Sequence, residues 1–347
     1  MSPERVQEEP PGELCPAAHL AIAFAEKRTP TATRPVVAFK FGGTSLLGAE
    51  RMLHAAGLVR DAAQFSHVVV VVSAMKGVTD RLLSLARSVT ERKLARARHD
   101  AESLVHLHLD VLHDLALSCE PHETVRRRLE LLSRDLLHDV SSRTAASAEP
   151  ELSDRLASFG ERLSARLFAG ALEKSGIGAV PVASSEFVLT CDTFRDAKPH
   201  LEQTRALGRS VLLPLLEDGL VPVVTGFIGA TLDGRITTLG RNSSDYSGAI
   251  IAHVVDAEEL VIWTDVDGVY TANPLESSEA RLLHDLSYQE AHALAAAGAK
   301  VLHPQVLPLA AETEMTVWIR NTFRPHVRGT RIGLPATNAS SAFGGAA

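Results

Sequence analysis

The residues best suited to chemistry gather in residues 237–274, which begin T-T-L-G-R-N-S-S-D-Y-S. A hydroxyl-rich loop opens a helix here, and Ser243 or Ser244 can cap that helix and leave backbone N–H groups free for an anion. Arg241 suits a bidentate grip on a carboxylate, and Asp245 can order a nearby lysine or bind an amino group. The pattern indicates an anion site, and a capped helix with a surface ion pair is the plainer alternative.

The second half of this stretch reads E-L-V-I-W-T-D-V-D-G-V-Y from residue 259, an apolar strand that ends in a polar turn. Thr264 and Asp265 offer polar contacts at the turn, and Tyr270 offers a ring for an adenine. Asp265 and Asp267 have the spacing of calcium ligands, but no further acids follow where a calcium loop needs them. The turn therefore favours a nucleotide site over a calcium site.

Near the start, residues 40–45 read K-F-G-G-T-S and follow a short apolar strand. Gly42 and Gly43 let the backbone approach an anion closely, and Lys40 adds a point charge suited to phosphate. The spacing of a Walker A loop is absent. A phosphate-binding turn and a tight turn with a surface lysine both agree with these residues.

Two further motifs carry isolated charges. The stretch F-G-E-R-L-S at 159–164 puts Glu161 at the start of a helix, where the helix dipole stabilises an acid. A functional interpretation gives this carboxylate to the ammonium group of a substrate. The stretch G-A-K-V-L-H-P at 298–304 places Lys300 after another helix. Lys40 and Lys300 can flank a transferring phosphoryl group and neutralise the charge that builds on it.

The composition of the 347 residues excludes several classes of protein. A net charge of −7 argues against a nucleic-acid binder, and 5% aromatic residues leave little for base stacking. Three scattered cysteines predict neither a disulfide framework nor a zinc site. His106, Asp110 and His113 lie at helical spacing, which a solvated helix face explains better than a metal site. No apolar run reaches the roughly 20 residues of a membrane helix, and the start lacks a secretory signal, so a cytoplasmic location is expected.

The order of the predicted elements favours an α/β fold, an open and mostly parallel sheet with helices on both faces. Strands are expected at 36–41, 68–72, 179–183, 187–190, 221–225, 259–263 and 315–320, with a hairpin turn at 233–234. Helices are expected at 50–64, 79–90, 199–217, 244–255 and 287–297, and through most of 91–176 with breaks near Pro121 and Pro150. Ligands of such sheets bind beyond the carboxyl ends of the strands, where every motif above falls. Residues 1–34 are interpreted as a flexible arm, 35–333 as the catalytic domain, and 334–347 as a disordered tail.

Taken in order, these motifs resemble the catalytic domain of the aspartate kinases, within the amino-acid kinase superfamily. The stretches T-T-L-G-R-N-x-S-D-Y-S and I-W-T-D-V-D-G-V-Y-T resemble most of all the kinase portion of the bifunctional aspartate kinase–homoserine dehydrogenases. The resemblance spans about residues 36–333 and implies a three-layer αβα fold and a homodimer. It also implies that the γ-phosphoryl group of ATP, with Mg²⁺, passes to the side-chain carboxylate of L-aspartate to give 4-phospho-L-aspartate.

The same resemblance implies roles for single residues. The catalytic residues that it implies are Lys40, Asp245 and Lys300, with Asp245 holding both lysines. The substrate-binding residues that it implies are Thr79, Glu161, Phe227, Arg241 and Ser244. The nucleotide-binding residues that it implies are Lys40, Phe41, Gly42, Gly43, Ser73, Thr264, Asp265, Tyr270, Lys300 and Val301. Because the acceptor is already an anion, catalysis would depend on alignment and charge neutralisation and would need no general base.

Three departures from the family pattern bear on function. Ser243 stands where the family usually has glycine, so it would crowd a position that needs a positive φ. Leu275 replaces an arginine that would reach the ATP phosphates, a charge-assisted hydrogen bond of about 1.5–3 kcal/mol. The sequence stops shortly after Gly333, where the family usually continues into ACT domains that bind lysine or threonine. Insensitivity to these end products is therefore expected.

Two other functions remain open. One is a kinase-like subunit that binds a ligand or a partner with weakened or no turnover, which Ser243 and Leu275 motivate. The other is a kinase for another acidic substrate, such as glutamate or an acylated amino acid. Arg241 together with Glu161 favours a free amino acid, because both ends of the substrate would be recognised.

Overall fold

An eight-stranded sheet forms the centre of the structure, a computed structural model that describes residues 34–117, 123–141, 149–272, 274, 277, 279–296 and 302–334. Its strand order is β10-β12-β11-β7-β1-β2-β4-β3, and every neighbouring pair is parallel except β11 and β12. The strands of this sheet are β1 (Val36–Phe41), β2 (His67–Val72), β3 (Ala179–Val182), β4 (Val221–Thr225), β7 (Glu259–Thr264), β10 (Asp285–Leu286), β11 (Thr316–Asn321) and β12 (Thr330–Ile332). Two small antiparallel pairs join β5 (Ile228–Ala230) with β6 (Ile236–Thr238), and β8 (Val269–Tyr270) with β9 (Leu282–Leu283).

The valine run of β2 shows why this sheet is covered on both faces. Successive side chains of a strand point to opposite faces. Val68, Val70 and Val72 belong to one hydrophobic cluster, whereas Val69 and Val71 belong to the other. All five are buried, so the strand needs a helical layer above and below it.

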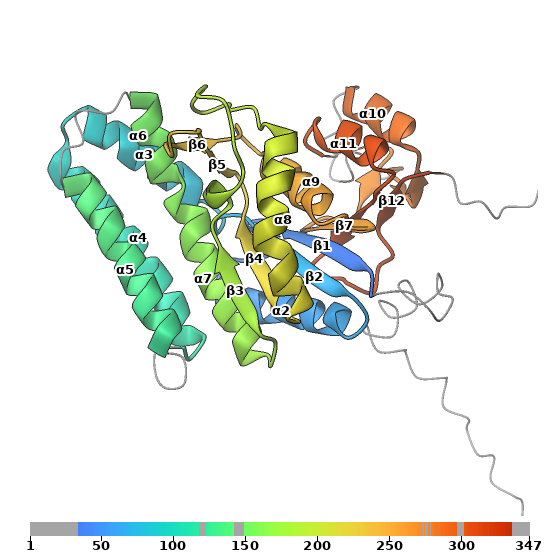
Figure 1. Cartoon of the computed structure of the whole chain (residues 1–347), viewed down its shortest axis with the longest axis horizontal. Helices are drawn as coiled ribbons and strands as arrows, with labels where there is room; N and C mark the ends of the chain where they lie inside the picture. The colour runs from blue at the N-terminus through green and yellow to red at the C-terminus, as the bar shows by residue number, and fades with distance from the viewer. Residues whose placement is uncertain are drawn as a thin grey trace, which may run out of the picture.

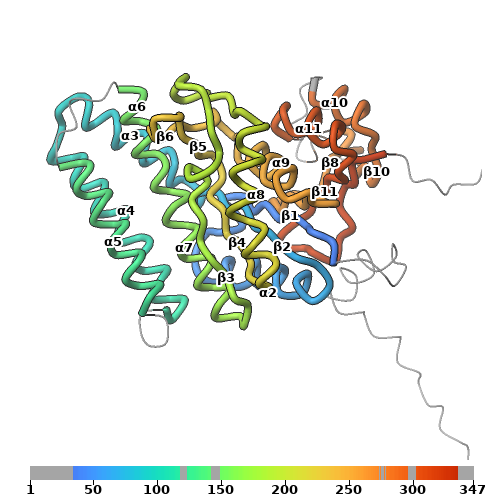
Figure 2. Tube along the Cα trace, viewed as in Figure 1, coloured from blue at the N-terminus to red at the C-terminus, as the bar shows by residue number. Residues whose placement is uncertain are grey.

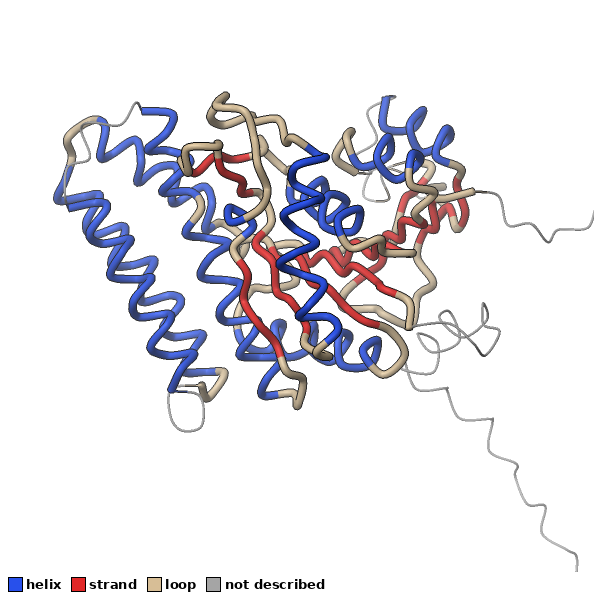
Figure 3. Tube along the Cα trace, in the orientation of Figure 1, coloured by secondary structure: helices blue, strands red, loops and turns tan. Residues whose placement is uncertain are grey.

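Helices supply both layers, as Figure 1 shows around the central strands. The first cluster packs under α2 (Ala49–Ala63), α3 (Val78–Thr90), α4 (Leu94–Asp114), α5 (Glu123–Ser141), α6 (Glu149–Ala157) and α7 (Phe159–Lys174). The second packs under α8 (Leu201–Glu217), α9 (Ser244–Val254), α10 (Tyr288–Ala296) and α11 (Val306–Glu312). The pair α4 and α5 extends to one side of the sheet (Figure 3). The predicted α/β class, with an open and mostly parallel sheet between helical layers, is confirmed.

One prediction about local structure is wrong. Residues 187–190 do not form a strand of the sheet: they follow the short 3₁₀ helix η1 (Ser184–Glu186) and make only isolated bridges at Leu189 and Thr190. The amide of Leu189 donates to the Thr204 hydroxyl at 3.1 Å, so a helix side chain takes the place of a strand partner. The predicted break near Pro150 corresponds to a helix boundary: α5 ends at Ser141 and α6 begins at Glu149, so Pro150 lies in the first turn of α6, where its missing N–H costs nothing.

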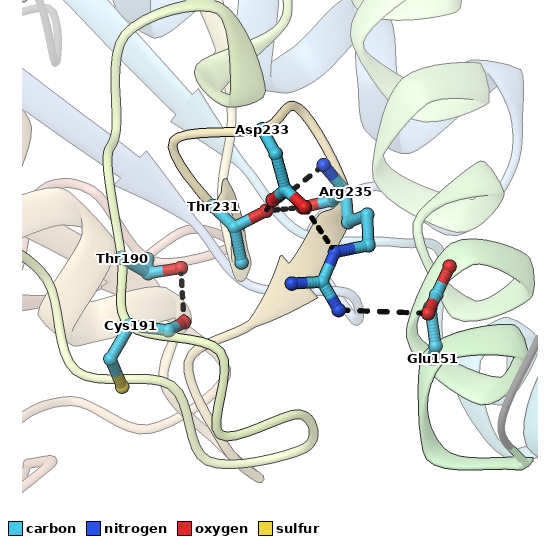
Figure 4. A network of polar contacts seen from close by, with 6 residues as sticks. All are labelled: Glu151, Thr190, Cys191, Thr231, Asp233 and Arg235. Atoms are coloured by element: carbon cyan, nitrogen blue, oxygen red, sulfur yellow. Dashed lines mark hydrogen bonds and ion pairs between the residues drawn. The ribbon is translucent and has the colours of Figure 1, made fainter.

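The β5–β6 hairpin has its predicted turn and is anchored to α6. Arg235 donates to Asp233 at 2.8 Å and lies 3.8 Å from Glu151 of α6 (Figure 4). Asp154, also on α6, accepts hydrogen bonds from the amide and hydroxyl of Thr238 at 2.8 and 2.9 Å. These contacts fix the end of β6, which leads directly into the loop before α9.

The carboxyl ends of four neighbouring strands meet at one edge of the sheet. Phe41 at the end of β1 is in register with Val72 of β2 and Trp263 of β7, and Val72 is in register with Thr225 of β4. The loops after β1, β2, β4 and β7 therefore lie side by side, as the trace in Figure 2 allows the reader to follow. This is the edge where open α/β sheets bind ligands.

Several predictions fall on parts of the chain that the structure leaves undescribed. The arm and the tail lie outside the described residues, apart from Arg34, which donates to the Ala63 carbonyl at 2.8 Å, and Leu334. Among the described residues no helix is both long enough and apolar enough to cross a membrane.

Candidate active site

The loop after β1 holds the predicted lysine and its partner. Lys40 is 6% exposed, and its Nζ lies 2.7 Å from Oδ1 of Asp245 in the first turn of α9. Two segments that are 205 residues apart in sequence thus meet in one ion pair, as the resemblance implied. A carboxylate therefore holds the Lys40 ammonium in place. The ammonium also lies close to the backbone of Gly42: a Cβ added to Gly42 would be 3.6 Å from Nζ of Lys40.

Gly43 is required by its surroundings. A Cβ at this position would lie 2.5 Å from the Ala74 carbonyl oxygen and 3.0 Å from the Lys76 nitrogen. Both are backbone atoms of the loop after β2, so neither can move aside cheaply. The two loops are also joined by a hydrogen bond from the Lys76 amide to the Gly43 carbonyl, at 3.1 Å. The turn at 42–45 is therefore a fixed element of the site.

Phe41 enters the site only through its backbone. Its ring is buried in the core, 5.4 Å from the Phe168 ring and 6.2 Å from the Trp263 ring, measured between centroids. Its carbonyl accepts the amide of Ser73 at 3.2 Å, which joins the ends of β1 and β2. The predicted nucleotide contact at this position is therefore limited to main-chain atoms.

The loop before α9 corrects two expectations. Ser243 directly precedes the first residue of α9, but no side chain caps this helix, and the Ser243 hydroxyl is buried without a hydrogen-bond partner among the described residues. The position that takes a positive φ is Asn242 (61°), together with Gly240 (92°), whereas Ser243 has an ordinary φ of −80°. Asparagine tolerates the left-handed region, so the backbone does not need glycine at 243.

Glu161 is the most strongly perturbed group at this edge. It lies in the first turn of α7, is 3% exposed, and accepts the Ala74 amide on Oε1 at 3.1 Å. Oε2 is buried and has no hydrogen-bond partner within the described part of the chain. Burial raises the pKa of Glu161 to about 8, and the Ala74 hydrogen bond opposes this only in part. The carboxyl is therefore ready to ionise when a cation arrives.

A cleft of about 380 Å³ joins these elements. It is formed by residues 43–44, 73–77, 79–80 and 241–244 with Leu83, Glu161 and Phe227, and is called the central cleft below. The five residues predicted to bind the substrate all line it: Thr79, Glu161, Phe227, Arg241 and Ser244. Its volume lies within the usual range for small-molecule sites. The central cleft is thus the place where the predicted substrate residues converge.

Phe227 and Arg241 are held in different ways at the wall of this cleft. Phe227 has a φ of 67°, and its amide donates to the Ser247 hydroxyl of α9 at 2.7 Å. Arg241 is 81% exposed and pairs with the equally exposed Asp80 of α3, with Nη2 and Oδ1 3.6 Å apart. Arg241 is thus free to exchange Asp80 for another carboxylate.

The predicted nucleotide residues lie in and beside the β7–β8 loop, residues 265–268. The Thr264 hydroxyl is 3.4 Å from Asp265, and the Tyr270 hydroxyl is 3.3 Å from Oδ2 of Asp267. Burial, followed by the charge of Asp267, raises the pKa of Tyr270. The loop carries polar side chains that are partly exposed to solvent, which suits contact with the polar edge of a nucleotide.

Some predicted residues cannot be placed. Lys300, Val301 and the departure at Leu275 lie outside the described residues. The pairing of Asp245 with a second lysine therefore stays a prediction, whereas its pairing with Lys40 is seen.

A second cleft of about 360 Å³ lies at the opposite edge of the sheet, near the amino ends of β7 and β11. It is lined by His253, Asp256, Glu258 and the turn at 313–316. None of the predicted site residues reaches it, so the central cleft is the better candidate.

A known protein family matches most of this chain. The model of the amino acid kinase family matches residues 35–321. The chain belongs to the amino acid kinase family. Lysine-sensitive aspartokinase 3 of Escherichia coli is 32% identical over 297 residues, which cover 86% of this chain and 64% of that protein. A bifunctional aspartokinase/homoserine dehydrogenase 2 of maize is 34% identical over 309 residues, which cover 84% of this chain and 32% of that protein.

A solved amino acid kinase supports the same placement. The crystal structure of E. coli aspartokinase III in complex with aspartate and ADP superposes with a TM-score of 0.77 at 32% identity. The match covers 87% of this chain and 65% of that one. This chain therefore spans less than two thirds of the length of the relatives that it resembles. The resemblance to aspartate kinases and the amino-acid kinase fold are both confirmed.

Five residues that shape this site are not predicted from the sequence: Asp80, Ser247, Asp267, Asn321 and Arg324. Asp80 follows Thr79 directly and pairs with Arg241. Asp267 has the spacing of a calcium ligand in the sequence, and its place in D-x-D-G is also typical of a turn that needs an acid. Asn321 and Arg324 gave no local signal, because their partner Asp267 is more than 50 residues away.

Proposed function

We propose that this chain is an aspartate kinase, which transfers the γ-phosphoryl group of ATP to the side-chain carboxylate of L-aspartate. One observation carries this: a buried carboxyl, Glu161, and an exchangeable guanidinium, Arg241, line one cleft, and Ser244 of that cleft directly precedes Asp245 of the Lys40–Asp245 pair. A free acidic amino acid has an ammonium group and a carboxylate for the first two, and a second carboxylate for the reaction. The relative whose structure contains aspartate and ADP supports both substrates.

Each end of the amino acid then has a partner. Arg241 exchanges Asp80 for the α-carboxylate, and Ser244 lies beside it in the cleft. Glu161 takes the α-ammonium group and ionises as it does so. Thr79 and Phe227 line the remaining wall, and the side-chain carboxylate would point toward Gly43 and the loop that follows Lys40.

The chemical step needs no proton transfer. An oxygen of the side-chain carboxylate attacks the γ-phosphorus, a new O–P bond forms, and the bond to the β-phosphate oxygen breaks. The products are 4-phospho-L-aspartate and ADP. Lys40, oriented by Asp245, offsets the negative charge that two approaching anions would otherwise concentrate. Alignment in a fixed loop at 42–45 supplies the rest.

Magnesium carried by the nucleotide fits this donor set. Within the described residues, no three His, Cys, Asp or Glu side chains lie together as an all-protein cage. Mg²⁺ usually keeps several waters and is held by substrate phosphates with one or two carboxylates. Asp245 and Asp265 are two of the carboxylates at the loops concerned and would hold the ion with the phosphates, and bound magnesium would neutralise phosphate charge. A homodimer and a cytoplasmic location stay predictions.

The experiment measures ADP release by the full chain with ATP, Mg²⁺ and a panel of acids. The panel tests which groups of the acceptor the site recognises, and it contains L-aspartate, L-glutamate, N-acetyl-L-aspartate and succinate. L-aspartate should give the highest kcat/KM. N-acetyl-L-aspartate and succinate lack an ammonium group, so they would leave Glu161 unpaired. A preference for glutamate or for the acylated acid would replace aspartate as the substrate. ATP binding without turnover on any acid would make the chain a binding subunit.

A further inference from the structure

The segment 321–324 after β11 runs beside the β7–β8 loop. Asn321 is in register with Thr264, so the residues that follow the two strands lie next to each other. The Thr322 amide donates to the Thr264 carbonyl at 2.8 Å and prolongs the pairing by one residue. Segment 321–324 is therefore a neighbour of the predicted nucleotide residues, although nothing in its own sequence marks it as one.

Asp267 is held from three directions at this junction. Oδ1 accepts from Nδ2 of Asn321 at 2.7 Å, and Oδ2 accepts from Nη1 of Arg324 at 2.6 Å. The same Oδ2 accepts the Tyr270 hydroxyl at 3.3 Å. The Asp267 side chain is only 12% exposed, whereas that of Arg324 is 56% exposed. Asp267 is thus a carboxylate fixed in place, and Arg324 is its counter-ion.

The other side of the same segment is tied to the loop after β1. The hydroxyls of Ser45 and Thr322 share a buried hydrogen bond at 2.6 Å. The His54 ring of α2 contacts the Thr322 carbonyl at 2.6 Å, and the Arg51 guanidinium lies over the Phe323 ring at 4.8 Å. Segment 321–324 therefore contacts both the turn at 42–45 and the β7–β8 loop, and it fixes the distance between these two parts of the site.

We propose that Arg324 is a positioning residue of the nucleotide site, where it holds Asp267 and, through it, the Tyr270 hydroxyl. This inference rests on the proposed function, which assigns Thr264, Asp265 and Tyr270 to the binding of a purine nucleotide. Two acids, Asp265 and Asp267, lie in a loop that must accept a polyanion. Arg324 neutralises one of them and keeps it in the orientation that Tyr270 needs. Without the guanidinium, Asp267 would turn away or repel the phosphates.

The test compares Arg324→Ala with Arg324→Lys and with Arg328→Ala. Arg328 is a matched control: it lies in the same connection, is 51% exposed, and pairs with Asp285 at 2.8 Å instead of with Asp267. Binding of ADP with Mg²⁺ is measured by calorimetry in the absence of any acceptor. Steady-state KM values for ATP and for the acceptor are then measured separately on the same proteins.

Arg324→Ala should bind ADP about fivefold more weakly and raise the KM for ATP to match, as expected for one partly exposed ion pair. The KM for the acceptor should not change, Arg324→Lys should recover most of the affinity, and Arg328→Ala should bind like the wild type. Wild-type ADP affinity in Arg324→Ala would overturn the inference, as would an equal rise in both KM values, which would indicate general loosening.

The same data separate this inference from the proposed function. If wild type binds ADP with the Arg324 dependence described but phosphorylates no acid, the inference stands and the kinase assignment fails. If wild type phosphorylates aspartate and Arg324→Ala is unchanged, the reverse holds. If wild type binds no nucleotide at all, both fail.

Discussion

The central cleft and the β7–β8 loop hold their charged groups in opposite ways. Glu161 in the cleft and Lys40 in the loop beside it are buried, and their partners are a backbone amide and a carboxylate on fixed elements. At the β7–β8 loop, Asp267 depends on Arg324, whose side chain is more than half exposed. Removing one partner of a buried charge is far more costly than breaking an exposed pair. Substitutions in the cleft should therefore have the larger effects.

The largest effect is expected at Lys40. Lys40→Met removes the buried ammonium that we propose to face the transferring group, and it leaves Asp245 unpaired. The value of kcat should fall by about 10²–10³-fold, as for other preorganised groups that stabilise a transition state. Steady-state ADP release measures it, with Lys93→Met as the control. Lys93 is an exposed lysine, 58% accessible, that pairs with Glu91 away from the cleft. Equal activity of the two variants would contradict the role of Lys40.

Glu161→Gln should act mainly on acceptor binding. The amide keeps the shape of the side chain but cannot carry the negative charge that an ammonium group needs. The KM for L-aspartate should rise by about 10–100-fold, the size of a lost hydrogen bond to a charged group, while the KM for ATP changes little. Glu173→Gln, the same substitution on an exposed position of α7, should behave like the wild type. A rise in the KM for ATP instead would place Glu161 elsewhere in the reaction.

The pH dependence of acceptor binding should report the same carboxyl. Burial raises the pKa of Glu161 from its usual 4.5 to about 8, so the ligand-free protein carries it protonated at neutral pH. Binding of an ammonium group requires the ionised form, so the KM for L-aspartate should fall as the pH rises toward 8. Glu161→Gln should lose this dependence. A wild-type profile that is flat from pH 6 to 8.5 would contradict the assignment.

The contribution of Glu161 to the stability of the fold should decrease as the pH rises, whereas its contribution to acceptor binding should increase. The folded state binds the proton more tightly than the unfolded state, so the stabilising contribution is complete below pH 4.5 and is lost as the pH rises through 8. Denaturant unfolding of wild type and Glu161→Gln over this range measures the difference. The wild type should lose stability relative to the variant as the pH increases.

The smallest effect is expected at the exposed ion pair between Arg241 and Asp80, which line the central cleft. Asp80→Asn removes the partner of Arg241, but an exposed pair at 3.6 Å contributes less than about 1 kcal/mol. The KM for L-aspartate should change by no more than about fivefold, and in the direction of tighter binding, because a competing carboxylate is gone. Arg241→Gln should weaken acceptor binding by more than that. If Asp80→Asn weakens binding as much as Arg241→Gln, Asp80 contributes to the site directly.

The sequence was sufficient for the features that depend on local pattern. The valine run of β2, the turn at Gly42 and Gly43, and the helix beginning at Ser244 each follow from residue type and spacing. The pairing of Lys40 with Asp245 came from the family motifs, since no local pattern joins residues so far apart.

The errors and omissions have physical causes. A serine before a helix usually caps it, but the Ser243 hydroxyl is buried with no partner among the described residues, and the strain in this loop falls on Asn242 instead. Residues 187–190 have the composition of a strand, yet a threonine side chain from α8 satisfies the Leu189 amide. Asp267 and Arg324 meet because β7 and β11 pair in one register, which only the folded sheet reveals.

The most direct measurement is chemical trapping of the product. The full chain is incubated with L-aspartate, ATP and Mg²⁺ in the presence of hydroxylamine, which converts an acyl phosphate into a stable hydroxamate. The expected product is the β-hydroxamate of aspartate, formed in amounts equal to the ADP released, with little from succinate and almost none with Lys40→Met. Release of ADP without hydroxamate, or equal hydroxamate from wild type and Lys40→Met, would contradict a carboxylate kinase built around the Lys40–Asp245 pair.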